Sequence, residues 1–220
     1  MGIEHYGTKA NIEKDNIQMK NDSIQYRKEL RTEKIKARNS IPLAEREVLS
    51  RQISERIFSS TVFQQANRIM LYRAVRGEVD LTILAELGES SHKQILYPLC
   101  INDSEMIALL PEDEHAWQKG FCGIMEPIRE RSVEVLPKQI DLVICPCTVF
   151  DEAGGRMGMG AGFYDRFLAK CHNACVAAAA FEVQKIPAIP RESWDREMDI
   201  VFTEKTVYHR SILSMKNVNQ

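Results

Sequence analysis

A glycine-rich segment carrying one arginine and one aspartate is the part of the sequence best suited to chemistry. It reads GGRMGMGAGFYD over residues 154–165, with Arg156 among the glycines and Asp165 after the last of them. Glycines allow positive φ and let backbone N–H groups approach an anion closely. A guanidinium matches phosphate oxygens, and a carboxylate can hold a Mg²⁺ that bridges phosphates. The segment therefore predicts a binding loop for a nucleotide polyphosphate.

The glycine spacing by itself leaves a second interpretation open. Gly158, Gly160 and Gly162 do not form the G-x-G-x-x-G pattern of a dinucleotide fold, and no G-K-[ST] marks a Walker A loop. In the alternative interpretation the glycines only shape a tight crossover, and Asp165 only complements a helix terminus.

The elements around the loop must place it at a ligand-binding edge. DLVICPCTVF, residues 141–150, predicts a central strand covered on both faces, and GFYDRFLAKCH after the loop predicts a helix. Ligands of an open α/β sheet bind beyond the carboxyl ends of its strands, where such a loop lies. We expect the positive end of the helix dipole to point at the same place.

The rest of the chain alternates between strand and helix patterns. Residues 1–22 are polar and predict a tail that is either disordered or helical near its end. The helical pattern begins at Ser23, with Asp22 or Ser23 as the candidate cap. A second helix follows Pro42, and a third begins at GEVDL with Glu78 and Asp80 near its start. Strands are expected at RIMLYRAV, KQILYPLCI, EMIALLPE and ACVAAAAFE, with a helix as the alternative for ACVAAAAFE, and DIVFTEKTVYH ends the ordered chain. Residues 113–140 predict a long loop. The alternation indicates one α/β domain over residues 23–212 with a mostly parallel sheet.

Composition excludes several classes of partner. The chain has 220 residues, and its 29 basic and 31 acidic residues give a net charge of -2, so nothing favours nucleic acid or an anionic membrane. No apolar run is long enough to cross a bilayer. Without an export signal, the six cysteines predict reduced thiols in a cytoplasm. Cys145 and Cys147 are one residue apart, which is not a metal-ligand spacing, and we expect both to be buried and structural.

Several motifs together resemble one family. GGRMGMGAGFYDRFL resembles the signature of 5-formyltetrahydrofolate cyclo-ligases, also called methenyltetrahydrofolate synthetases. RKELR resembles that family's N-terminal basic pair, GEVDL its acidic motif before a helix, and GIMEP its Gly-Ile-x-Glu-Pro turn. FEVQ and DREMDIVFTE resemble its ending, so the resemblance covers roughly residues 24–204.

The resemblance implies a fold and a reaction. The fold is a three-layer α/β sandwich with a mostly parallel central sheet flanked by helices. The reaction uses Mg²⁺ and ATP to convert 5-formyltetrahydrofolate to 5,10-methenyltetrahydrofolate, releasing ADP and phosphate. In the chemistry proposed for the family, the formyl oxygen is phosphorylated, N10 attacks, and phosphate leaves.

The resemblance also implies roles for individual residues. Arg31 and Arg156 become catalytic residues, Asp165 and Asp195 metal ligands, and Glu78 a folate contact. The implied ATP-binding residues are Arg27, Lys28, Glu29, Leu30, Arg31, Arg156, Met157, Gly158, Met159, Gly160, Ala161, Gly162, Phe163 and Tyr164. The implied folate-binding residues are Glu78, Met159, Gly160, Ala161, Gly162 and Phe163.

The sequence departs from the family pattern at three positions. Arg27 stands where many members have lysine, Ala161 where glycine or lysine is frequent, and Phe163 where tyrosine is frequent. The expected partners are the small molecules ATP and 5-formyltetrahydrofolate, and we expect a monomer. The competing hypotheses are a binding protein that has lost turnover and a different small-molecule kinase or ligase.

Overall fold

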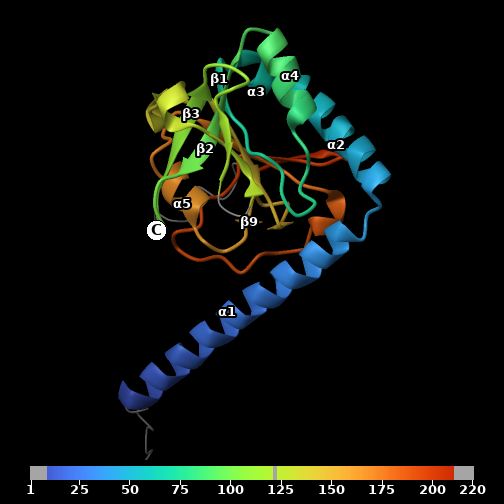
Figure 1. Cartoon of the computed structure of the whole chain (residues 1–220). Helices are drawn as coiled ribbons and strands as arrows, with labels where there is room; N and C mark the ends of the chain where they lie inside the picture. The colour runs from blue at the N-terminus through green and yellow to red at the C-terminus, as the bar shows by residue number, and fades with distance from the viewer. Residues whose placement is uncertain (1–8, 121–122, 211–220) are drawn as a thin grey trace, which may run out of the picture.

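The computed structural model describes residues 9–120 and 123–210 of the chain (Figure 1). Five α-helices lie in this part of the chain: α1 (Lys9–Asn39), α2 (Leu43–Phe58), α3 (Thr61–Gln65), α4 (Thr82–Ser90) and α5 (Phe163–Leu168). The strands are β1 (Arg68–Met70), β2 (Gln94–Cys100), β3 (Met106–Pro111), β4 (Trp117–Lys119), β5 (Met125–Pro127), β6 (Ser132–Val135), β7 (Leu142–Pro146), β8 (Val149–Phe150), β9 (Arg156–Met157), β10 (Cys175–Ala179), β11 (Ile200–Phe202) and β12 (Val207–His209). Short 3₁₀ turns lie at Arg129–Arg131, Pro137–Gln139 and Glu182–Gln184.

The main sheet is parallel at its centre and antiparallel at both edges. Its eight strands run in the order β12-β11-β10-β7-β1-β2-β3-β6. The five strands from β11 to β2 are mutually parallel, while β12 and β3 each run against their inner neighbour. This arrangement confirms the predicted α/β fold with a mostly parallel sheet.

Alternation along the central strands divides the core into two clusters. On β7, Leu142 and Ile144 pack in one cluster, and Val143 and Cys145 pack in the other. The first cluster includes residues of α2, α3 and α4, and the second includes residues of α5. Because successive side chains of a strand point to opposite faces, the sheet is covered on both sides, as its apolar run predicted.

Helix α1 begins earlier than expected. Its helical backbone starts at Lys9, so Asp22 and Ser23 lie inside the helix and cannot cap it. No glycine or proline interrupts residues 9–39, and glutamate, lysine and glutamine there all favour helix. In Figure 1 the first turns of α1 extend away from the rest of the molecule.

The carboxyl end of α1 is fixed to the sheet through one buried arginine. Arg38 is fully buried and donates hydrogen bonds to the carbonyls of Cys147 and Arg76, at 3.2 and 2.9 Å. These carbonyls follow the ends of β7 and β1. The contact therefore places α1 across the edge of the sheet where a ligand site was expected.

Three other sequence expectations have clear outcomes. Residues 113–140 are not one long loop, because they contain β4, β5 and β6, and β6 pairs with β3 at the sheet edge. ACVAAAAFE contains strand β10, so its helical alternative is wrong. The helix after the glycine loop spans only six residues, so its dipole contributes less to the site than expected.

No helix in the described ranges has the length and apolar character needed to cross a membrane. The expected end of the domain at residue 212 lies outside the described residues.

Candidate functional site

One large cavity lies at the carboxyl edge of the parallel strands. Its volume is about 1060 Å³. Tyr72 reaches it from the segment after β1, Cys100 from the end of β2, and Pro146 from the end of β7. The cavity therefore occupies the position that the strand–loop–helix order predicted.

The glycine segment has two parts with different structures. In the first part, β8 and β9 form a two-stranded ribbon that pairs Phe150 with Arg156. Gly154 turns the chain between these strands at φ +86, and a Cβ there would lie 2.4 Å from the Met198 carbonyl oxygen. The second part, residues 158–162, lines the cavity and leads into α5.

Two arginines hold the second part of the loop. Arg31 Nε donates to the Gly158 carbonyl at 3.0 Å, and Arg166 Nη2 donates to the Ala161 carbonyl at 2.9 Å. Among the described residues, no acceptor takes a hydrogen bond from the backbone N–H groups of residues 158–162. Because the Gly158 and Ala161 carbonyls are held and the N–H groups are free, the loop can bind an anion with its backbone.

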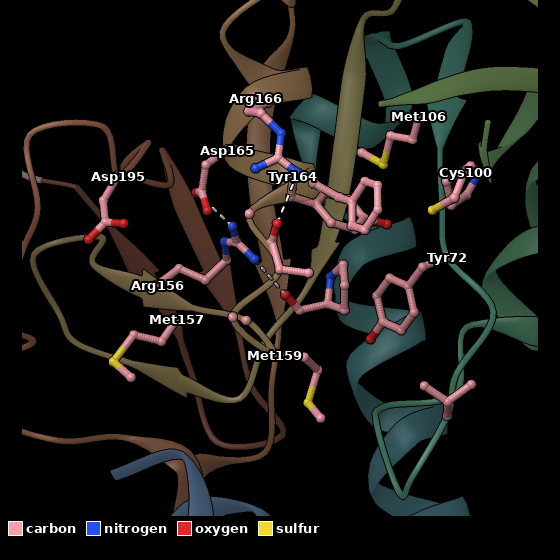
Figure 2. Close-up of a pocket in the computed structure, with 18 of the residues that line it drawn as sticks. Tyr72, Cys100, Met106, Arg156, Met157, Met159, Tyr164, Asp165, Arg166 and Asp195 are labelled. Carbon is pink, nitrogen blue, oxygen red and sulfur yellow. Dashed lines mark hydrogen bonds and ion pairs between the residues drawn. The ribbon is translucent and has the colours of Figure 1, made fainter. Parts of the chain in front are cut away.

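Arg156 and Asp165 form an ion pair at the centre of the site. Arg156 Nη2 lies 2.9 Å from Asp165 Oδ1, and Arg156 Nη1 donates to the Pro146 carbonyl at 3.1 Å. The arginine side chain is 2% exposed and the aspartate side chain 22%. In Figure 2 this pair lies between Asp195 on one side and Tyr72 and Cys100 on the other.

A second pair links α1 to the segment before β11. Arg27 donates to both carboxylate oxygens of Asp195, at 2.7 and 3.3 Å, and also to the Pro190 carbonyl. The backbone N–H of Glu192 donates to Asp195 Oδ2 at 2.9 Å. Arg27 and Arg31 are one helical turn apart, so both face the cavity from α1.

The remaining residues of the RKELR motif face elsewhere. Lys28 and Glu29 are exposed, whereas Leu30 is buried against Val149 and Met157. None of the three lines the cavity. Their predicted contact with ATP therefore has no support from the geometry, whereas Arg27 and Arg31 line the cavity.

Glu78 lines the cavity as a buried carboxylate. It is 9% exposed, and its Oε2 accepts a hydrogen bond from the Val75 N–H at 3.1 Å. Burial raises the pKa of Glu78, and this rise is only partly offset by the Val75 hydrogen bond and by the charges of Arg38 and Arg76. Glu78 precedes α4 by four residues, and Asp80 instead receives the hydrogen bond from the Thr82 N–H.

The buried cysteines are poor nucleophiles. Cys145 and Cys147 are inaccessible, and burial raises the pKa of each thiol to about 12. Both stay protonated at neutral pH, which confirms the expectation of buried cysteines. Within the described residues, no group of three or more histidine, cysteine, aspartate or glutamate side chains could hold a metal ion.

Several cavity residues were not predicted from the sequence. They include Arg73, Tyr97, Glu126, Arg166 and Trp194. Tyr164 was predicted to bind ATP, and its buried hydroxyl has no hydrogen-bond partner among the described residues. Glu126 lies in the GIMEP motif, which was a usable signal. Arg166 follows Asp165 in the glycine-rich signature, which was also a usable signal. Arg73, Tyr97 and Trp194 reach the cavity only through the tertiary fold.

The family model described as the 5-formyltetrahydrofolate cyclo-ligase family matches residues 23–204. This range contains every residue assigned above to the cavity. The chain belongs to this family. The predicted resemblance is thereby confirmed.

Relatives named 5-formyltetrahydrofolate cyclo-ligase match this chain over nearly their full length. The Haemophilus influenzae protein of that name is 29% identical over 180 residues, covering 79% of this chain and 95% of the relative. The Mycolicibacterium smegmatis protein is 30% identical over 190 residues, covering 80% and 93%. The NMR structure of Aquifex aeolicus 5,10-methenyltetrahydrofolate synthetase superimposes with a TM-score of 0.75 at 29% identity, covering 84% and 92%.

Family membership fixes the class of reaction. 5-Formyltetrahydrofolate cyclo-ligases convert 5-formyltetrahydrofolate to 5,10-methenyltetrahydrofolate, and the family implies ATP as co-substrate. The chain is therefore a ligase of folate one-carbon metabolism.

Proposed function

We propose that this chain closes 5-formyltetrahydrofolate to 5,10-methenyltetrahydrofolate in a reaction that consumes ATP and requires Mg²⁺. One observation carries the proposal. A single cavity contains a glycine loop with free N–H groups, five arginines, two aspartates and the buried Glu78. Such a site suits a polyphosphate and a second ligand at once.

The loop side of the cavity is suited to the ATP phosphates. Phosphoryl transfer depends on alignment and on compensation of charge more than on a protein nucleophile. Arg31 and Arg156 supply fixed positive charge, and the N–H groups of residues 158–162 supply hydrogen bonds. We assign Arg27 to the same side, because its guanidinium lies one turn before Arg31 on α1.

Asp165 is the better of the two predicted metal ligands. Its Oδ1 is bound to Arg156, while its Oδ2 receives no hydrogen bond from a described residue. Mg²⁺ usually takes one or two carboxylates and completes its shell with phosphate oxygens and water. The residues present fit that requirement, and the ion would neutralise charge on the ATP phosphates.

Asp195 can serve as a metal ligand only if it loses at least one of its hydrogen bonds from Arg27. Its Oδ2 accepts two hydrogen bonds and its Oδ1 accepts one. We therefore propose Asp165 as the principal metal ligand and Asp195 as an outer partner that positions Arg27.

The folate is proposed to bind between the loop and Glu78. The Glu78 carboxylate can accept hydrogen bonds from pterin N–H groups. Residues 159–163 would border the formyl group, which brings its oxygen next to the terminal phosphate of ATP. The formyl oxygen attacks that phosphate, ADP departs, N10 then attacks the activated carbon, and the phosphate leaves as the ring closes. The chain supplies position, charge and exclusion of water for these steps.

The test is to incubate the protein with ATP, Mg²⁺ and 5-formyltetrahydrofolate and to follow the methenyl chromophore together with ADP. We expect one ADP for each methenyl product and no ADP without the folate. ADP release at the same rate without folate would indicate a different ATP-consuming enzyme. Binding of both ligands without any product would indicate a protein that has lost turnover.

A further inference from the structure

Arg73 is a cation in the cavity that the proposed function leaves without a role. It follows β1 and lines the cavity, yet its side chain forms no hydrogen bond or ion pair with a described residue. Its Nε is buried and has no acceptor among them. The other cavity arginines all have polar partners: Arg27 with Asp195, Arg31 with Gly158, Arg156 with Asp165, and Arg166 with Ser104 and Ala161.

Two aromatic rings fix the Arg73 guanidinium in place. Its central carbon lies 4.2 Å from the centroid of the Trp117 ring and 5.0 Å from that of the Tyr97 ring. The two rings pack edge to face, with centroids 4.8 Å apart. Contacts with ring faces order a guanidinium but do not use its N–H donors. Arg73 is therefore oriented before any ligand arrives, and its donors remain available.

A buried donor without an acceptor costs free energy, so its persistence requires an explanation. Glu126 also lines the cavity but forms no ion pair with Arg73. A ligand with an anionic group would satisfy the guanidinium. The planar fork of arginine matches a carboxylate with two parallel hydrogen bonds.

The two substrates of the proposed reaction carry only two kinds of anionic group. These are the phosphates of ATP and the carboxylates of the glutamate tail of the folate. The glycine loop, Arg31 and Arg156 already serve the phosphates. Arg73 lies five residues before Glu78 on the same segment, and Glu78 is the proposed folate contact.

Resting on the proposed function, we infer that Arg73 binds a carboxylate of the glutamate tail of 5-formyltetrahydrofolate. It is thus a specificity-determining residue that selects folates with an ionised tail. Trp117 and Tyr97 act as its positioning residues.

The test is a cycle of two proteins and two ligands. Dissociation constants are measured for wild-type protein and Arg73→Gln with 5-formyltetrahydrofolate and with its neutral diamide, in which both glutamate carboxylates are amides. We expect the wild-type protein to bind the acid roughly 10- to 100-fold more tightly than the diamide, the scale of a hydrogen bond to a charged group. Arg73→Gln should bind both ligands with the weaker affinity, and its KM for ATP should be unchanged.

A matched control is Arg129→Gln, which removes an arginine that pairs with Glu134 on the surface. Its affinities for the acid and for the diamide should both equal those of the wild-type protein. Melting temperatures of both variants show whether the loss of affinity reflects a loss of fold. If Arg73→Gln does not fold, the wild-type ratio of acid to diamide still decides, because equal affinities contradict the inference.

Three other results overturn the inference. Equal weakening of acid and diamide by Arg73→Gln would place Arg73 against an uncharged part of the folate. A raised KM for ATP with unchanged folate affinity would place Arg73 on the nucleotide. Unchanged affinity for every ligand would leave Arg73 without a role in binding. In each case wild-type turnover of 5-formyltetrahydrofolate would still support the proposed function, whereas its absence would refute that function first.

Discussion

Two arginine–aspartate pairs line the cavity, and they differ in how much of the carboxylate each arginine occupies. Arg27 binds both oxygens of Asp195, and the Glu192 N–H occupies Oδ2 as well. Both side chains of this pair are nearly buried, at 10% and 11% exposure. Arg156 binds only Oδ1 of Asp165, and the aspartate keeps twice that exposure, at 22%.

The difference supports the proposal that Asp195 is a structural contact and Asp165 a metal ligand. The Arg27–Asp195 pair joins α1 to the segment before β11, and Arg27 also binds the Pro190 carbonyl there. A carboxylate whose oxygens are all used gains little from a cation, because it must first release its partners. The Arg156–Asp165 pair instead fixes the orientation of Asp165 through Oδ1 and leaves Oδ2 without a hydrogen bond from a described residue.

The largest effect is expected from Asp165→Asn. Asparagine keeps the shape but is a neutral and weaker ligand for a hard cation, so turnover should fall by at least ~100-fold, since a catalytic metal contributes several kcal/mol. Stability should fall by about 1–3 kcal/mol, because the buried Arg156 loses its counter-charge but keeps an acceptor. Steady-state kinetics and denaturant unfolding measure the two effects. Near-normal turnover would make Asp165 a structural charge only.

Asp195→Asn should have the opposite balance, with a larger effect on stability than on turnover. The substitution removes one charge of the nearly buried Arg27–Asp195 pair, so the free energy of unfolding should fall by about 2–4 kcal/mol. The KM for ATP should rise roughly tenfold, because Arg27 is no longer held in position. Turnover at saturating ATP should change less than in Asp165→Asn. A turnover loss as large as that of Asp165→Asn would show that Asp195 takes part in the chemistry.

Glu78→Gln should weaken the binding of folate alone, in contrast to the two aspartate substitutions. The KM for 5-formyltetrahydrofolate should rise roughly tenfold, the scale of one hydrogen bond to a charged group. The KM for ATP should stay constant. An equal rise in both constants would place Glu78 at the junction of the two ligands and not on the folate side.

The same substitution has a pH signature. The folded-state pKa of Glu78 is raised above its ordinary value of 4.5, so ionisation of Glu78 opposes folding. The cost is absent at pH below the ordinary value and develops as pH rises toward the raised value. Glu78→Gln removes this cost, so its stability relative to the wild-type protein should improve with rising pH. Melting temperatures across this range provide the check, and a constant difference would contradict it.

The position of the site could be predicted because it depends on local order. A buried strand, a glycine loop and a helix follow one another between residues 141 and 168, and this order puts Arg156 and Asp165 at the carboxyl edge of a parallel sheet. Arg27 and Arg31 could be predicted from their motif. Their spacing of four also separates them from Lys28, Glu29 and Leu30, which must face other directions on a helix.

The parts that could not be predicted depend on contacts between distant segments. Arg73 is ordered by Trp117 and Tyr97, and these rings come from separate strands. Both carboxylate oxygens of Asp195 are bound by Arg27 of α1, and no local sequence pattern predicts this contact between distant segments. The edge strand β6 is only four residues long and two of them are polar, so its pairing with β3 left too weak a signal inside residues 113–140.

The most direct test of the difference between the Arg156–Asp165 and Arg27–Asp195 pairs is a Mg²⁺ titration. The Mg²⁺ concentration for half-maximal rate is measured at saturating ATP and folate for wild-type protein, Asp165→Asn and Asp195→Asn. Asp113→Asn, which removes a surface pair with Arg131, is the matched control. We predict that the half-maximal concentration rises strongly in Asp165→Asn alone and that high Mg²⁺ restores part of its rate. A rise in Asp195→Asn with no change in Asp165→Asn would contradict this account and assign the metal to Asp195.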